Sequence, residues 1–193
     1  MESLPVSETT VFARLRADVA VLAGRAAARS NTRYVLRYGL FSPGLHYVLG
    51  RRLQEALVKI PLVGGILRRF HWFVQALLFS TDISPTATIG GGFYLPHPFA
   101  IVIGDGAVIG RNVSIYQNVT IGQRNADNAA MARIEDNVYI GAGAVILGGV
   151  TVGAGAIIGA NAVVLQDVPA GARAVGNPAR IVSGAAGERT QAG

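Results

Sequence analysis

The pattern of hydrophobic positions divides the chain into two parts with different periods. Up to Ser80, apolar residues recur at steps of three and four, which is the spacing of amphipathic helices. The first predicted helix carries its apolar stripe at Val11, Leu15, Val19 and Leu22. We therefore expect an α-helical N-terminal domain over residues 1–80.

Two more helices are predicted in this domain. Ser42 and Pro43 indicate the start of the second, because serine can cap free amides and proline suits the first turn. The pair Ile60-Pro61 ends it, and its expected stripe is Leu45, Val48, Leu49, Leu53 and Leu57. The third, residues 62–79, is apolar and aromatic but contains two arginines and a histidine. Those groups argue against a membrane span and leave open a helix on a membrane surface.

From Ile83 onward the hydrophobic period is six. A small or β-branched residue stands two positions before most of the aliphatic ones, and glycine commonly follows them. Neither an ordinary strand nor an ordinary helix has this period. The thirteen aliphatic positions are Ile83, Ile89, Leu95, Ile103, Ile109, Ile115, Ile121, Ile134, Ile140, Ile146, Val152, Ile158 and Val164.

A hexad repeat predicts a parallel β-helix, in which each unit forms one short strand and one corner. The aliphatic side chain points inward, and Gly, Asn or Asp supplies the left-handed backbone of a tight corner. Asn112 and Asn137 fit that corner role. Stretches such as GDGAVIG are therefore corners, since no helix follows them to complete a nucleotide-binding loop. The expected fold class is α+β, with a helical domain followed by a β-helix over residues 81–182 and a flexible tail, 183–193.

The repeat is interrupted twice. The step from Leu95 to Ile103 is eight, and the step from Ile121 to Ile134 is thirteen, which predicts an extruded loop at residues 123–133. Insertions leave a solenoid at its corners and often carry the binding surface. Both interruptions are therefore candidate functional segments.

Charge and composition restrict the remaining possibilities. The net charge is +6, but residues 1–80 hold 11 Lys+Arg against 4 Asp+Glu, while residues 81–193 hold 6 against 7. The basic helical half is expected to be a solvated surface, with contact to an anionic membrane as an alternative. No nucleic-acid motif is present. The chain has no cysteine, and its polar N-terminus does not resemble a signal peptide, so a cytoplasmic location is expected.

The motifs of the second half resemble the hexapeptide-repeat acyltransferases, in particular the serine O-acetyltransferase branch. The segment DISPTATIGGGFYLPH, from Asp82 to His97, is similar to that branch's first repeat, and ANAVVLQDVPAGARAVGNPARIV is similar to its ending. The resemblance implies that the β-helix is left-handed, that the chain forms a homotrimer, and that neighbouring subunits share each site. Whether the helical domains pair two trimers stays open.

Acetyl transfer to a hydroxyl needs a base, and histidine suits that role because its pKa is near neutrality. Only His97 of the three histidines lies in the repeat domain. The resemblance implies that His97 is the base and that Asp82 holds its productive tautomer. His46 and His71 are expected to be structural. Because the metal-dependent branch of this solenoid needs three histidines per site, no metal is expected.

The resemblance also implies acetyl-CoA as the acyl donor, bound in the groove between subunits. Small corner residues let its pantetheine arm run close to the backbone. The positions carried over are Gly122, Gln123, Ala142 and Ala160, with Arg180 near the CoA phosphates.

The acceptor side departs from the serine O-acetyltransferase pattern. Pro96 stands where that branch has an aspartate, and the Arg-His pair of its loop aligns with Ala130 and Met131. The loop resembles that of exopolysaccharide and colanic-acid acetyltransferases, so a sugar or glycan acceptor is the first expectation. Serine O-acetylation with a divergent site and a non-catalytic solenoid scaffold are the alternatives. The candidate acceptor-binding residues are Gln117, Asn118, Arg124, Asn125 and Asp127.

Overall fold

The computed structural model describes residues 10–27, 41–125 and 129–182. Its N-terminal part contains helices α1 (Val11–Ala27), α3 (Pro43–Leu57) and α4 (Gly64–Phe79). The side chain of Ser42 accepts a hydrogen bond from the Leu45 amide at 3.4 Å, which confirms the predicted cap. The three predicted helices are therefore present, and the first strand starts three residues after α4 ends.

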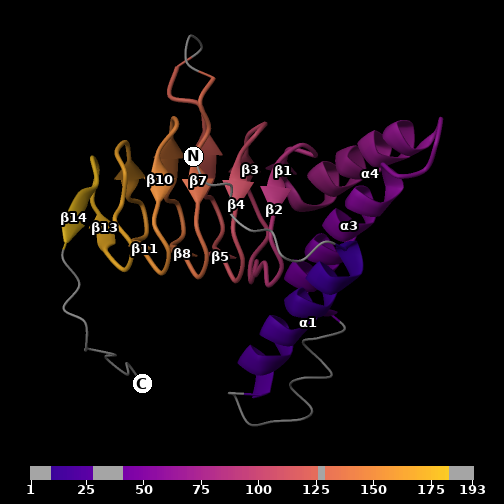
Figure 1. Ribbon diagram of the computed structural model, residues 1–193, viewed down its shortest axis with the longest axis horizontal. Coiled ribbons are helices and arrows are strands. Elements are labelled where there is room, and N and C mark those ends of the chain that lie inside the picture. Colours follow the sequence, from indigo (N-terminus) through magenta and orange to yellow (C-terminus); the bar gives the residue numbers. More distant parts are fainter. Residues whose placement is uncertain (1–9, 28–40, 126–128, 183–193) are drawn as a thin grey trace.

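The second part is a three-sided stack of short parallel strands (Figure 1). The first sheet contains β1 (Asp82–Ile83), β3 (Val102–Ile103), β6 (Thr120–Gly122), β9 (Val145–Leu147) and β12 (Val163–Val164). The second contains β2 (Thr88–Ile89), β4 (Val108–Ile109), β7 (Arg133–Ile134) and β10 (Thr151–Val152). The third contains β5 (Ser114–Ile115), β8 (Tyr139–Ile140), β11 (Ile157–Ile158), β13 (Arg173–Val175) and β14 (Arg180–Val182), of which β14 is antiparallel to β13.

The register confirms the hexad reading. Val102 pairs with Thr120, eighteen residues later, which is one coil of three hexads. Asp82 pairs with Val102, so the first coil is two residues longer, as the interruption around His97 requires. All thirteen predicted inward positions are at most 1% exposed. The aliphatic column is therefore the core of the solenoid, and its burial is the main stabilising contribution.

Corners of the solenoid use two different kinds of residue. Asn112 and Asn137 adopt φ of 56° and 61°, as predicted. The glycines directly after the aliphatic positions do not have positive φ, and most of them are needed for close stacking instead. A Cβ on Gly141 would lie 2.7 Å from the Ala160 amide nitrogen of the next coil. Positive φ belongs to a glycine two positions later, such as Gly143 at 69°.

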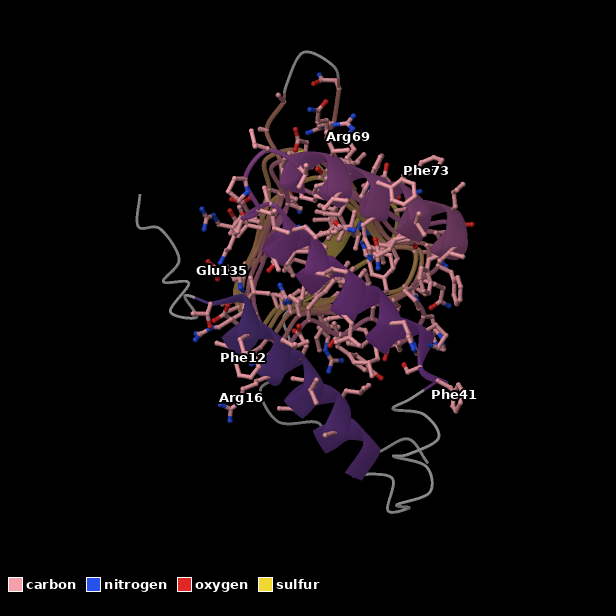
Figure 2. The ribbon with its side chains drawn as sticks, turned by 90° about the vertical axis from the view of Figure 1, so that its right-hand side faces the viewer. Phe12, Arg16, Phe41, Arg69, Phe73 and Glu135 are labelled. Carbon is pink, nitrogen blue, oxygen red and sulfur yellow. The ribbon has the colours of Figure 1, made fainter. Side chains whose placement is uncertain are left out.

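The helical part packs against the open end of the first coil (Figures 1 and 2). Two arginines of α3, each 2% exposed, make this contact. Arg51 donates to the Ala87 carbonyl, and Arg52 donates to the carbonyls of Ile89 and Gly90 at 3.0 and 2.6 Å. These carbonyls flank β2, which has no further strand on that side. Guanidinium groups thus satisfy a strand edge that would otherwise be unpaired.

The predicted apolar stripe of α3 is only partly correct. Val48 is buried as predicted, but Leu49 and Leu53 are 38% and 46% exposed, and the buried face also includes Tyr47 and the two arginines. The reason is that α3 covers a strand edge, whose carbonyls need hydrogen-bond donors more than apolar contacts. The spacing of hydrophobic residues along the sequence cannot predict a buried helix face that is made of polar side chains.

An apolar stripe on α4 points away from this contact. Ile66, Phe70, Phe73 and Leu77 are each more than half exposed. None of the described helices is both long and apolar enough to cross a membrane. Contact of this part with a membrane surface stays a prediction.

Candidate functional site

His97 lies exposed at the corner where the chain passes from the third sheet to the first. We call residues 96–101, 116–119, 141–144 and 159–162, which stack along this edge, the His97 corner. The segment after His97 is held by the buried hydroxyl of Thr81, which donates to the Pro98 carbonyl at 2.8 Å and accepts from the Ile101 amide at 3.2 Å. These two hydrogen bonds of the Thr81 hydroxyl therefore hold the backbone segment that follows the His97 imidazole.

Two tyrosines extend from His97 along the solenoid. The ring centroids of His97 and Tyr116 are 6.5 Å apart, and those of Tyr116 and Tyr139 are 5.1 Å apart. The hexad pattern did not single these residues out, because both stand beside an inward aliphatic position and point outward. Their spacing of 23 residues hides their adjacency, since the extruded loop separates them in sequence.

Asp82 lies at the exposed position of β1, in the first sheet. Its carboxylate accepts a hydrogen bond from the indole Nε1 of Trp72 on α4 at 3.1 Å. In the described residues of one subunit, no hydrogen bond joins this carboxylate to His97. The backbones are nevertheless adjacent, because the Asp82 amide donates to the Ile101 carbonyl at 2.8 Å.

An open cavity of about 370 Å³ adjoins Asp82 between α4 and the first coil. Its wall on α4 carries two arginines and the Trp72 indole, and its wall on the solenoid carries two aspartates and two hydroxyl groups. His97 is not among the lining residues. The charged lining residues are Arg68, Arg69, Asp82 and Asp105.

Four of the five residues assigned to the acyl donor occupy two edges of the first sheet. Ala142 and Ala160 stack at the His97 corner, where the amide after Ala160 donates to the Ala142 carbonyl at 2.9 Å. Gly122 ends β6 and Gln123 follows it, at the opposite edge where the extruded loop leaves. Arg180 lies exposed on β14 at the far end of the solenoid. One subunit therefore does not bring these five residues together.

The candidate acceptor-binding residues are also divided between the His97 corner and the extruded loop. Gln117 and Asn118 belong to the His97 corner, and the Asn118 amide donates to the Phe99 carbonyl at 3.0 Å. Arg124 and Asn125 are exposed on the extruded loop. Asp127 lies outside the described residues.

The end of the loop packs back onto its own solenoid. Met131 is partly buried against the core, and a Cβ on Gly104 would lie 2.6 Å from the Met131 Cε atom. A Cβ on Gly149 would lie 2.8 Å from the Ala130 Cβ. The two positions that align with an Arg-His pair are therefore used here for packing.

The other histidines have contacts within the helical part. His46 Nδ1 lies 2.8 Å from the Ser42 carbonyl, and His71 Nδ1 lies 3.4 Å from the Gln54 side-chain nitrogen. Burial lowers the pKa of the His71 imidazole below its ordinary value. In the described ranges, no group of three or more His, Cys, Asp or Glu residues is arranged to hold a metal ion.

Comparison with known proteins places this solenoid in a defined family. The family described as bacterial transferase hexapeptide (six repeats) matches residues 131–166. A serine acetyltransferase of Bacillus subtilis is 37% identical over 157 residues, covering 81% of this chain and 70% of the relative. A probable serine acetyltransferase 1 of rice, Oryza sativa, is 52% identical over 114 residues. That match covers 58% of this chain and 38% of the rice protein.

Solved structures agree with the sequence relatives. The serine acetyltransferase of Neisseria gonorrhoeae in complex with serine matches with a TM-score of 0.77 at 33% identity, over 91% of this chain and 70% of that one. A soybean serine acetyltransferase complexed with serine also gives a TM-score of 0.77, at 36% identity, over 91% of this chain and 71% of that one. The helical domain and left-handed β-helix expected from the sequence are thus confirmed.

These relatives overturn one expectation. The sequence reading favoured a sugar or glycan acceptor and a role in polysaccharide biosynthesis, whereas the matching proteins are serine acetyltransferases. The amide-rich loop caused the error, because amide groups hydrogen-bond amino acids as well as sugar hydroxyls.

Proposed function

Because the chain belongs to the serine acetyltransferase family of hexapeptide-repeat transferases, we propose that it transfers the acetyl group of acetyl-CoA to the hydroxyl of L-serine. The observation that supports this most is the exposed histidine at a rigid corner of a solenoid with this ancestry. The products are O-acetylserine and free CoA. The alternative reading left from the sequence is a solenoid without catalytic activity.

In this proposal His97 is the general base. Its imidazole takes the proton of the serine hydroxyl while the oxygen attacks the thioester carbonyl, and it then returns the proton to the departing CoA sulfur. Thr81 fixes the backbone beside it, so that the ring meets the acceptor in one orientation. The ring of Tyr116 lies beside the imidazole, with the two ring centroids 6.5 Å apart.

Asp82 is proposed to orient His97 and to stabilise its protonated form. This role requires the carboxylate to leave, or to share, the hydrogen bond from Trp72. The carboxylate is exposed and its backbone is bonded to Ile101, four residues after His97, so a change of side-chain rotamer is the movement needed.

We propose that acetyl-CoA binds along the first sheet and that a second subunit completes the site. The fit to the donor rests on small side chains: Ala142 and Ala160 leave the backbone of the His97 corner accessible. Gly122 and Gln123 lie at the opposite edge and would reach the donor from a neighbouring copy, while Arg124 beside them would reach the acceptor. A homotrimer, in which each corner meets the next subunit's loop, satisfies this requirement.

The proposal is tested by measuring thiol release from acetyl-CoA with L-serine as acceptor. We expect turnover that depends on serine, and a loss of about 10²- to 10⁴-fold in His97→Asn, the range for removing a general base. His46→Asn is the matched control, because His46 is exposed in the helical part, where its ring nitrogen Nδ1 lies 2.8 Å from the Ser42 carbonyl. Serine-independent thiol release, or equal activity in His97→Asn, would refute the proposal.

Sharing of the site between subunits has its own test. Mixed assemblies of His97→Asn and Arg124→Ala subunits should recover activity that neither variant has alone, because some sites then receive both native residues. If the mixed assemblies are no more active than the two single variants, the His97 corner and the loop that carries Arg124 do not act together across a subunit interface.

A further inference from the structure

Gln117 carries a buried hydrogen-bonding atom with no partner. Its side-chain oxygen Oε1 is buried and unbonded, while its backbone carbonyl accepts a hydrogen bond from Gly143. Three other buried side-chain atoms in the described residues share this state, and all three belong to Arg14, Arg51 and Glu55 of the helical part. Gln117 is thus the one such case in the described solenoid.

The position of Gln117 connects it to the proposed base. The residue before it, Tyr116, has its ring beside the His97 ring, and the residue after it, Asn118, is hydrogen-bonded to the Phe99 carbonyl. The Gln117 backbone therefore lies one coil away from His97 on the same corner. A buried carbonyl oxygen that is left without a donor is costly, and this cost is removed when a ligand supplies the donor.

The His97 corner has a second property that bears on its ligand. Its residues, 96–101, 116–119, 141–144 and 159–162, include no Asp, Glu, Lys or Arg. Serine brings an ammonium group whose N–H donors need acceptors, and this corner offers no carboxylate for them. An amide oxygen is a neutral acceptor with two lone pairs, and a hydrogen bond to a charged donor is stronger than a neutral one.

We propose that Gln117 binds the ammonium group of the acceptor serine through its side-chain oxygen and so determines selection for an amino-acid acceptor. This proposal rests on the proposed function and adds a residue role to it. A rotation of the Gln117 side chain brings this oxygen, which is buried in the described structure, to the ligand. It then accepts one N–H of the ammonium while the serine hydroxyl faces His97. Selection for serine then depends on a neutral amide where a carboxylate would be the ordinary partner of an ammonium.

The test compares L-serine with 3-hydroxypropanoate, which has the same hydroxyl and carboxylate but no amino group. In the unmodified protein we expect a higher kcat/KM for serine. Gln117→Leu should lower kcat/KM for serine by about 10- to 100-fold, mainly through KM, and leave 3-hydroxypropanoate within about twofold. Gln117→Glu keeps an acceptor oxygen and should restore KM for serine to within a few-fold of the original value.

Controls separate the role in recognition from one in folding. Gln166→Leu removes the same amide at an exposed corner and should change neither acceptor. KM for acetyl-CoA and the unfolding temperature show whether each variant is folded. Unchanged KM for serine in Gln117→Leu, or equal losses for both acceptors, overturns the role of Gln117 and leaves the serine reaction standing. Absence of serine turnover in the unmodified protein overturns both.

Discussion

Arg52 is predicted to be a main determinant of how the helical part attaches to the solenoid. Its guanidinium makes a bidentate contact with Asp18, with N···O distances of 2.8 and 3.2 Å, and both side chains are 2% exposed. It also contacts Glu55 at 2.8 Å and donates to the carbonyls of Ile89 and Gly90. Asp18 in turn accepts from the Phe93 amide at 2.9 Å. One side chain thus joins α1, α3 and the first coil.

Replacing Arg52 by methionine keeps the volume and removes every one of these donors. Removing one partner of a buried ion pair costs about 3–5 kcal/mol, because the other charge stays buried without compensation. For a chain of this size, 1 kcal/mol lowers the unfolding temperature by about 2–4 °C, so we expect a decrease of roughly 6–20 °C. Burial disfavours the charged form of Arg52, but its hydrogen bonds and the charges of Asp18 and Glu55 keep its pKa above the ordinary value, so the guanidinium stays charged.

The assay is thermal unfolding followed by circular dichroism at one fixed protein concentration, since an oligomer's unfolding temperature depends on concentration. Arg16→Met is the matched control, because Arg16 is exposed on α1. The double variant Arg52→Met with Asp18→Leu removes the stranded charge and should be less destabilised than the sum of its two single variants. A decrease in Arg52→Met no larger than in Arg16→Met would refute the reasoning.

Three further predictions concern the site, one corner of the solenoid and a histidine of the helical part. Asp82→Asn should lower kcat for serine by at least about 100-fold with little change in KM, as expected for a residue that orients the base, and unaltered kcat would remove Asp82 from the mechanism. Gly143→Ala should destabilise the solenoid by more than about 1 kcal/mol, because Gly143 has φ of 69° and a Cβ would collide with the Asn161 side chain. Denaturant unfolding measures this loss of stability, and an unchanged free energy of unfolding would contradict the prediction. Burial lowers the pKa of His71, so the unfolded chain binds the proton more readily and stability should fall as pH drops below about 6.5. His71→Gln should flatten this dependence below about pH 6.5, as measured by thermal unfolding across pH, and an unchanged pH dependence would contradict the assignment.

The solenoid could be predicted from sequence to the level of individual side chains. Its inward positions follow from a strict period of six, and every one of them, from Ile83 to Val164, is buried. Such precision is possible because each coil contacts only its neighbours, so that local spacing determines tertiary position. His97 could be singled out for the same reason, because an interruption of a strict six-residue repeat can be recognised in the sequence alone.

The helical part could be predicted only as helices. The face of α3 that packs on the solenoid is determined by Arg51 and Arg52. Arginine is ordinarily exposed, so hydrophobic patterning does not predict that these two side chains are buried. Their partners are backbone carbonyls of Ala87, Ile89 and Gly90, which carry no sequence signature. The long separation of about 36 residues between donor and acceptor adds to this difficulty.

Recognition of the acceptor was misread for a related reason. Pro96, Ala130 and Met131 stand where charged serine-binding groups were expected, and their absence was interpreted as a change of substrate. That inference treats recognition as a set of fixed positions, whereas what a ligand requires is a hydrogen-bond partner of suitable chemistry within reach. A buried, unbonded oxygen such as that of Gln117 becomes visible only when coils are stacked and contacts are assigned. Loss of a residue from a motif is therefore weak evidence on specificity until the unpaired groups of the folded site are known.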